Sequence, residues 1–298
     1  MTLLEAADCF SKIRNTFVYH TYFKPADETY LLARFSGLSK LGWNFFWNAN
    51  HALEKYLKGI LLLHGESIKN KRHSTMALWN QLTDLSNRET IHNTRLKQYI
   101  TNANFSRETR SIASQQVDNF RKDFRDALSR LPNSFSEYVK LISHKGVPSS
   151  RYHESNVEFD SRMIPLLDEV VFELRNYCNL ITSDQNEILG GPLLEFILSE
   201  NSKFPPILVD CLTFGNSKYK LESEYNLRYQ KHWATFSSGA VENVKFTAER
   251  LFNHNKIDPE NAQNIISTFD EWMQKNIDDS VYKQFQLDIN KLARYFKP

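Results

Sequence analysis

Apolar residues recur at steps of three and four along most of this chain, the spacing that places them on one side of an α-helix. The clearest stretch is NANHALEKYLKGILLLHGE, residues 48–66, whose apolar stripe consists of Ala49, Leu53, Tyr56, Ile60 and Leu63. The 298 residues include only nine Gly and nine Pro, and the prolines lie mostly at the edges of segments. Few glycines and prolines favour long helices over many short strands. The sequence therefore predicts an all-α protein.

Capping residues predict where the first helices begin and end. Residues 27–63 read as two helices with a break between residues 37 and 42. The predicted caps are Asp27 at the start of the first helix, Gly65 at the end of the second, and Ser74 or Thr75 at the start of a third. In the third helix we expect Leu78, Leu82 and Leu85 to face the core.

A second long helix is predicted over residues 159–181, after the loop-like stretch VPSSRYHESN. Asp160 or Ser161 is its expected cap, with Pro165 in the first turn, where a missing N–H is tolerated. This helix and residues 43–64 both carry wide apolar stripes, so we expect them to pack against each other, antiparallel or nearly so. Farther along, Asp258 before Pro259 predicts another helix start.

Charge is nearly balanced over the whole chain, at +2, but not locally. Residues 88–130 contain nine Lys/Arg and five Asp/Glu, whereas residues 258–290 contain two Lys and seven Asp/Glu. The two segments can pair with each other, or the positive one can bind nucleic acid. A nucleic-acid patch predicts one solvent-facing side for Arg107, Arg110, Arg121 and Arg125. A merely solvated helix predicts pairing of these arginines with Asp118, Asp123 or Asp126.

The three cysteines, Cys9, Cys178 and Cys211, are far apart and form no CxxC motif, which indicates neither a zinc site nor a disulfide framework. The first residues are too polar and acidic for a signal sequence, and no apolar run of about 18 residues is present. We therefore expect a soluble, cytoplasmic protein with no metal, no cofactor and no membrane partner. Phosphate-binding loops, serine-hydrolase elbows and HExxH pairs are also absent from the sequence.

Four features together resemble the HEPN domain, a helical bundle. They are the YLLAR helix at residues 30–34, the stretch HALEKYLKGILLLHG at 51–65, a basic loop ending in His73, and RYH with the following helix at 151–181. The resemblance covers residues 27–85 and 151–181. It implies an N-terminal segment over 1–26, a HEPN-like bundle over 27–182 with a helical insertion at 86–150, and a C-terminal helical region over 183–298.

The resemblance implies a four- or five-helix up-and-down bundle, often a homodimer through that bundle, in a family linked to RNA or nucleotide chemistry. Such proteins belong to bacterial stress, toxin–antitoxin and antiviral defence systems. Some members are metal-independent ribonucleases with an Arg-(four to six residues)-His motif at a dimer cleft. Others lack that motif and act as binding or scaffold modules.

One stretch matches the spacing of the ribonuclease motif: Arg14 and His20 are separated by five residues, and Asn15 follows the arginine. A histidine can transfer the proton of a 2′-hydroxyl, and an arginine can stabilise charge on the phosphate. However, family members that cleave RNA carry the motif near the start of the last long helix, where this chain has Arg151-Tyr152-His153 with one intervening residue. The alternative is a helix end with a partly buried histidine.

A ligand site is expected where loops meet the polar face of residues 51–58. Its predicted members are His51, Lys55, Lys58, His73, Arg151, Tyr152 and His153, which can hold a phosphate. Glu54 is the nearest internal counter-charge; if it neutralises the cluster, the group is structural. The aromatic residues Trp43, Phe45, Phe46 and Trp47 are expected in the core, although such rings can also stack on bases.

These features support three functions in order. The first is a non-catalytic module that binds RNA, a nucleotide or a partner protein in a stress or defence system. The second is a metal-independent endoribonuclease that uses Arg14, Asn15 and His20. The third is a pure assembly or scaffold protein.

Overall fold

The computed structural model describes residues 2–71, 73–88, 90–115, 131–147, 159–181, 216 and 240–295. These residues form helices and connecting loops without a strand; an isolated bridge joins Asn104 and Ser134. The predicted all-α class is confirmed. Among the described helices, none is both long enough and apolar enough to cross a membrane.

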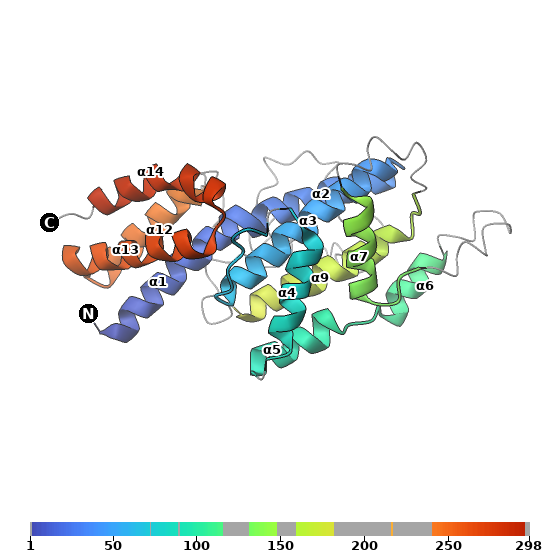
Figure 1. Cartoon of the computed structure of the whole chain (residues 1–298), viewed down its shortest axis with the longest axis horizontal. Coiled ribbons are helices and arrows are strands. Elements are labelled where there is room, and N and C mark those ends of the chain that lie inside the picture. The colour runs from blue at the N-terminus through green and yellow to red at the C-terminus, as the bar shows by residue number, and fades with distance from the viewer. Residues whose placement is uncertain are drawn as a thin grey trace, which may run out of the picture.

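The N-terminal part is one continuous helical run (Figure 1). It consists of α1 (Leu3–Val18), the π-helical turn η1 (Tyr19–Phe23) and α2 (Lys24–Leu38). The N–H of Lys24 donates to Tyr19 O five residues earlier, and Pro25 has no N–H with which to resume the α pattern. The prediction that a helix starts with Asp27 as its cap is therefore wrong: Asp27 lies inside α2, fully buried. The predicted boundary between residues 26 and 27 also falls within this helix.

Helix α3 (Gly42–Leu63) runs back along α2, because the chain turns at residues 39–41. Lys55 in the middle of α3 contacts Pro25 near the start of α2, and Asn48 contacts Ser36 near its end. All five residues of the predicted apolar stripe are buried. Gly65 has a φ of +76°, a conformation that favours glycine, and it follows the helix end as predicted.

Helix α9 (Met163–Ile181) completes the bundle core, but its direction differs from the prediction. The rings of Phe45 and Phe159 are 4.9 Å apart near the starts of α3 and α9, and His64 Nε2 lies 2.6 Å from the hydroxyl of Tyr177 near their ends. The two helices are therefore parallel, and the predicted antiparallel packing is wrong. Because α2 and α3 run in opposite directions, α9 is antiparallel to α2 instead. The helix begins at Met163, later than the predicted residue 159; Asp160 Oδ1 accepts from Arg162 N in the turn before it, and Pro165 lies in the first turn as predicted.

Shorter helices cover one side of this core: α4 (Thr75–Ser86), α5 (Ile91–Leu96), the π-helical turn η2 (Lys97–Thr101), α6 (Arg107–Gln115) and α7 (Phe135–Lys145). Ser74 caps α4 by accepting from Ala77 N, and the three predicted leucines are buried. After α7, Gly146 lies so close to α3 that an added Cβ would be 2.5 Å from Asn50 Cβ. A glycine is therefore needed where α7 ends against α3.

The C-terminal helices pack on α1, far from α5 and α6 (Figure 1). They are α12 (Ala240–His254), α13 (Pro259–Asn276) and α14 (Asp279–Tyr295). Asp258 caps α13 by accepting from Asn261 N, with Pro259 at the first turn, which confirms that predicted start. Phe17 of α1 joins the two parts, because its ring lies 5.8 Å from Phe269 and 5.2 Å from Phe285.

Candidate functional site

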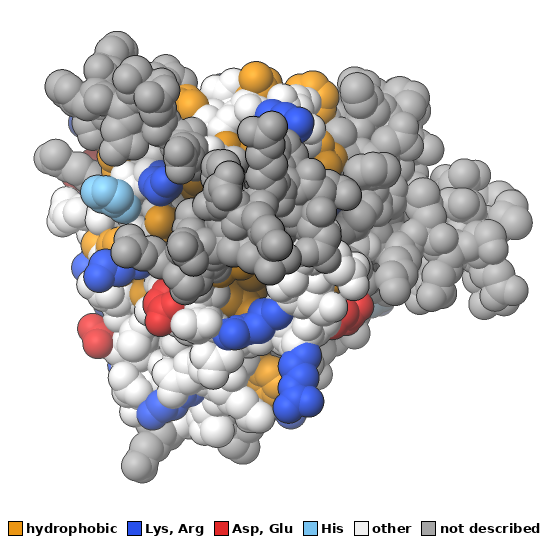
Figure 2. All heavy atoms as spheres, turned by 90° about the vertical axis from the view of Figure 1, so that its right-hand side faces the viewer, with side chains coloured by type: hydrophobic (Ala, Val, Ile, Leu, Met, Phe, Trp, Pro, Cys, Tyr) orange, Lys and Arg blue, Asp and Glu red, His pale blue; other side chains and the backbone are white. Residues whose placement is uncertain are grey.

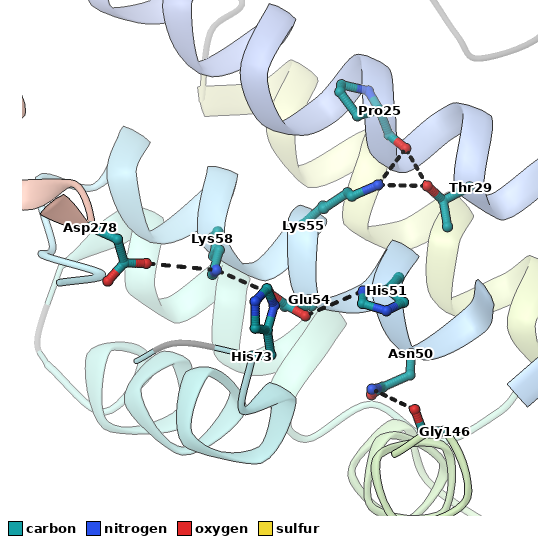
Figure 3. Close-up of polar contacts among 10 residues, drawn as sticks. All are labelled: Pro25, Thr29, Asn50, His51, Glu54, Lys55, Lys58, His73, Gly146 and Asp278. Carbon is teal, nitrogen blue, oxygen red and sulfur yellow. Dashed lines mark hydrogen bonds and ion pairs between the residues drawn. The ribbon is translucent and has the colours of Figure 1, made fainter. Parts of the chain in front are cut away.

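The polar face of α3 is organised around one buried carboxylate, Glu54, which is 3% exposed (Figure 3). Its Oε1 atom lies 2.9 Å from Lys58 Nζ and 3.0 Å from His73 Nδ1. Its Oε2 atom lies 3.6 Å from His51 Nδ1. Asp278, at the start of α14, extends the group, with an oxygen 3.9 Å from Lys58 Nζ. We call these five residues the Glu54 cluster.

The ammonium group of the Glu54 cluster is neutralised within the cluster. Burial by itself raises the pKa of the Glu54 carboxyl, but its interactions with His51, Lys58 and His73 outweigh burial and lower the pKa to about 2. Two carboxylates, Glu54 and Asp278, thus face one ammonium group. Three of the side chains expected to bind a ligand, His51, Lys58 and His73, have an acidic partner inside the protein, which favours a structural role for these three.

Lys55 does not join the Glu54 cluster. Its Nζ atom donates to Thr29 Oγ1 at 2.7 Å and to Pro25 O at 3.3 Å, which ties α3 to α2 (Figure 3). Burial lowers the pKa of this amine. The three remaining members of the predicted ligand site, Arg151, Tyr152 and His153, lie outside the described residues, so their part in it stays a prediction.

The loop after α3 connects the Glu54 cluster to the C-terminal helices. Ile68 N donates to Asn276 O at 3.0 Å, and Asn70 N donates to Asp278 Oδ1 at 2.9 Å. Lys69 Nζ lies 2.7 Å from Asp279 Oδ1 and 3.2 Å from Gln274 O. A cation at the end of α13 and acidic groups at the start of α14 suit the helix dipoles. The cluster therefore holds together segments distant in sequence.

Replacing Glu54 by glutamine should lower the free energy of unfolding and make that free energy depend less on pH. A carboxyl whose folded pKa is lowered stabilises the fold above its unfolded pKa, and this contribution is lost as the pH falls toward about 2. The contribution at neutral pH is about 3 kcal/mol. Urea unfolding at pH 7 and pH 3 should show a smaller difference for Glu54→Gln than for the wild type. The control is Asp288→Asn on α14, which removes a carboxylate that is exposed and paired with Lys291. If the free energy of unfolding changed equally between pH 7 and pH 3 in Glu54→Gln and in the wild type, Glu54 would not be the stabilising carboxylate.

Arg14 and His20 do not come together within the described chain. Six residues along an α-helix rotate a side chain by about 240°, so the two point in different directions. Arg14 donates to Asn15 Oδ1 at 3.1 and 3.2 Å, and the amide of Asn243 donates to His20 Nδ1 at 3.4 Å. Burial, with the nearby charge of Lys24, lowers the pKa of His20 to about 4. The imidazole is therefore neutral at pH 7 and lies in η1 beside α12.

The aromatic residues at the start of α3 divide into two pairs. Phe45 and Phe46 are buried, which confirms their predicted core position. Trp43 and Trp47 are only half-buried, so for them the prediction is wrong. Their rings stack with centroids 5.4 Å apart, and the Trp47 ring lies 4.3 Å from that of His51.

Two buried ion pairs between α2 and α9 were not predicted. Arg34 pairs with Asp168, and Arg175 Nη2 lies 2.9 Å from Asp27 Oδ2. Tyr30 donates to Asp168 at 2.6 Å, and Tyr56 donates to Asp27. Burial raises the pKa of Asp27 to about 6, against the effects of Arg175 and Tyr56. The signal in the sequence is the same in both helices: an Asp followed seven residues later by an Arg, which is about two turns.

The positive segment is only partly described. Arg107 and Arg110 are both exposed, and Arg110 Nη2 donates to Asn133 O at 2.9 Å. Arg121 and Arg125 lie outside the described residues, as do Asp118, Asp123 and Asp126. The acidic helices α13 and α14 lie at the other end of the molecule, so the described parts of the two segments do not pair within one chain (Figure 1).

The described part of the chain contains neither a metal-binding group nor a disulfide. No group of three His, Cys, Asp or Glu side chains there could hold a metal ion. Cys9 and Cys178 are buried free thiols, and burial raises the pKa of both; Cys211 lies outside the described residues.

Comparisons of the chain with protein-family models, with curated proteins and with solved structures find no match.

Proposed function

We propose that this chain is a non-catalytic, HEPN-like helical module that binds RNA, in a bacterial stress or defence system. The observation that carries the proposal is a run of exposed cations on consecutive helices of one side of the bundle: Arg95, Lys97, Arg107, Arg110 and Lys140. Residues 91–115 and 131–147 contain six Lys/Arg (these five and Lys145) and two Asp/Glu (Glu108 and Glu137). Such an excess of exposed cations favours contact with phosphates.

The state of the candidate catalytic groups supports binding over cleavage. His20 is neutral and hydrogen-bonded to Asn243, and Arg14 is held by Asn15. The last long helix of the HEPN-like region, α9, contains no histidine, and its Arg175 is buried against Asp27. The motif spacing of Arg14 and His20 still favours one second candidate, a metal-independent endoribonuclease. The resemblance also implies a homodimer.

Binding and cleavage can be tested separately with the full chain. We expect fluorescein-labelled single-stranded RNA to bind, with an affinity that falls steeply as salt rises. Arg107→Glu/Arg110→Glu should weaken binding and make the slope of log Kd against log salt shallower, by about one for each phosphate that the arginines no longer neutralise. The charge-matched control is Lys283→Glu/Arg294→Glu, two exposed cations on α14, which should bind as the wild type does.

Total RNA incubated with and without EDTA should remain intact. Cleavage that persists in EDTA and disappears in His20→Ala would replace the proposal by the endoribonuclease. Absence of RNA binding at low salt would instead favour an assembly or scaffold protein.

A further inference from the structure

Three rings form a ladder along one side of α3. Trp43, Trp47 and His51 follow each other at intervals of four residues, and all three are half-buried, whereas the intervening Phe45 and Phe46 are inside the core. Trp43 and Trp47 are inclined by 29° and stacked, and His51 meets Trp47 edge to face. The ring of His73 continues the series, 6.3 Å from His51. We call Trp43, Trp47 and His51 the ring ladder.

The ring ladder meets a carboxylate at its His51 end, where Glu54 lies, and is bordered by cations elsewhere. Between Glu28 and Glu54 the sequence has no Asp or Glu, and it includes Lys40 in the exposed turn before α3. The end of α7 borders the ladder, because Gly146 packs on Asn50. There His144 is exposed, and Lys145 Nζ lies 5.1 Å from the centre of the Phe46 ring. Figure 2 shows this end of the molecule, where Lys and Arg side chains lie among exposed hydrophobic ones, together with some Asp and Glu.

We propose that the ring ladder is a stacking surface for the bases of single-stranded RNA. The inference rests on the proposed RNA-binding function and names the place where the strand binds. Aromatic side chains stack on any base, while neighbouring cations attract the phosphates that connect the bases. Single-stranded rather than duplex RNA fits, because only unpaired bases can leave their own stack to contact a side chain.

The length of the ring ladder sets the length of strand that it accommodates. Eight residues of α-helix separate Trp43 from His51, a rise of about 12 Å. Stacked nucleotides rise about 3.4 Å each, so about three nucleotides lie along the ladder. The exposed arginines of α6 are then available to phosphates farther along the same strand.

The test uses the full chain, a fluorescein-labelled oligouridylate of 12 nucleotides, and an RNA duplex of the same length. Trp47→Ala and Trp43→Ala should each raise the Kd for the single strand about tenfold, because each removes a stacking ring. Trp47→Phe keeps an aromatic ring at this position, so its Kd for the single strand should stay within about threefold of the wild-type Kd. In the wild-type protein, the single strand should quench tryptophan fluorescence more than the duplex does.

The results separate this inference from the proposed function. If the wild type binds the oligouridylate but Trp43→Ala and Trp47→Ala bind it equally well, the ring ladder is not the site, whereas RNA binding stands. If the wild type binds no RNA, both proposals fall. Should an alanine variant unfold, the wild-type protein still decides: tryptophan fluorescence that the bound single strand does not quench would overturn the inference.

Discussion

Replacement of Arg34 by methionine is expected to lower the free energy of unfolding by about 3–5 kcal/mol. Arg34 is 0% exposed and Asp168 is 2% exposed, so the variant leaves a carboxylate in the interior without its cation. Tyr30 alone then remains as a donor to Asp168 among the contacts described above. The measurement is urea unfolding at pH 7, followed by far-UV circular dichroism.

Two further variants identify the cause of that destabilisation. Lys291→Met removes one partner of an exposed pair with Asp288 and should cost under about 1 kcal/mol. Arg34→Met/Asp168→Leu removes both buried charges and should recover much of the stability that the single variant lacks. A stability of Arg34→Met within about 1 kcal/mol of wild type would mean that the ion pair contributes little.

Phe17→Ala is the second substitution with a large expected effect, about 3–5 kcal/mol. The Phe17 ring is 1% exposed, and it contacts the rings of Phe269, Trp272 and Phe285. Its removal leaves a cavity between α1 and the C-terminal helices. Amide hydrogen exchange should therefore accelerate in α12–α14 more than in α3 and α9.

Leu3→Ala is the matched control on the same helix, since Leu3 is 92% exposed and should contribute less than about 0.5 kcal/mol. Uniform acceleration of exchange across all helices in Phe17→Ala would contradict a local role and indicate that the chain unfolds as a single unit.

Local features of the fold were predictable because their causes lie within a few residues. Ser74 caps α4 since its hydroxyl accepts from a neighbouring N–H, and Gly65 follows α3 since it adopts a positive φ. The apolar stripe of α3 is buried because its spacing places it on one side of the helix. None of these depends on a distant segment.

Features that depend on distant partners were missed. Asp27 has the residue type of a cap, but Tyr56 and Arg175 hold it inside a longer helix. The spacing of apolar residues predicts that α3 and α9 each bury a wide apolar face. It does not predict whether the two helices run parallel or antiparallel to each other. The reciprocal Asp–Arg spacing in α2 and α9 contained that information, because only antiparallel packing brings each Asp to the other helix's Arg.

The candidate site shows the same division. His51, Glu54 and Lys58 could be grouped from the sequence because helical spacing places them on one face of α3. Asp278 could not, since it is 220 residues from Lys58 and reaches it only through the packing of α13 and α14. Without that second carboxylate, the face reads as more cationic than it is.

The joining of α1 to the C-terminal helices has a consequence for synthesis of the chain. Phe17 leaves the ribosome 252 residues before Phe269, its partner in the finished fold. At about 5–20 residues per second, this interval lasts roughly 13–50 s, far longer than a helix needs to form. Until then the face of α1 that packs on the C-terminal helices is uncovered on the nascent chain. Chaperones that hold exposed apolar helices therefore have their longest opportunity at the N-terminus, and truncated chains that end before α13 should depend on them throughout.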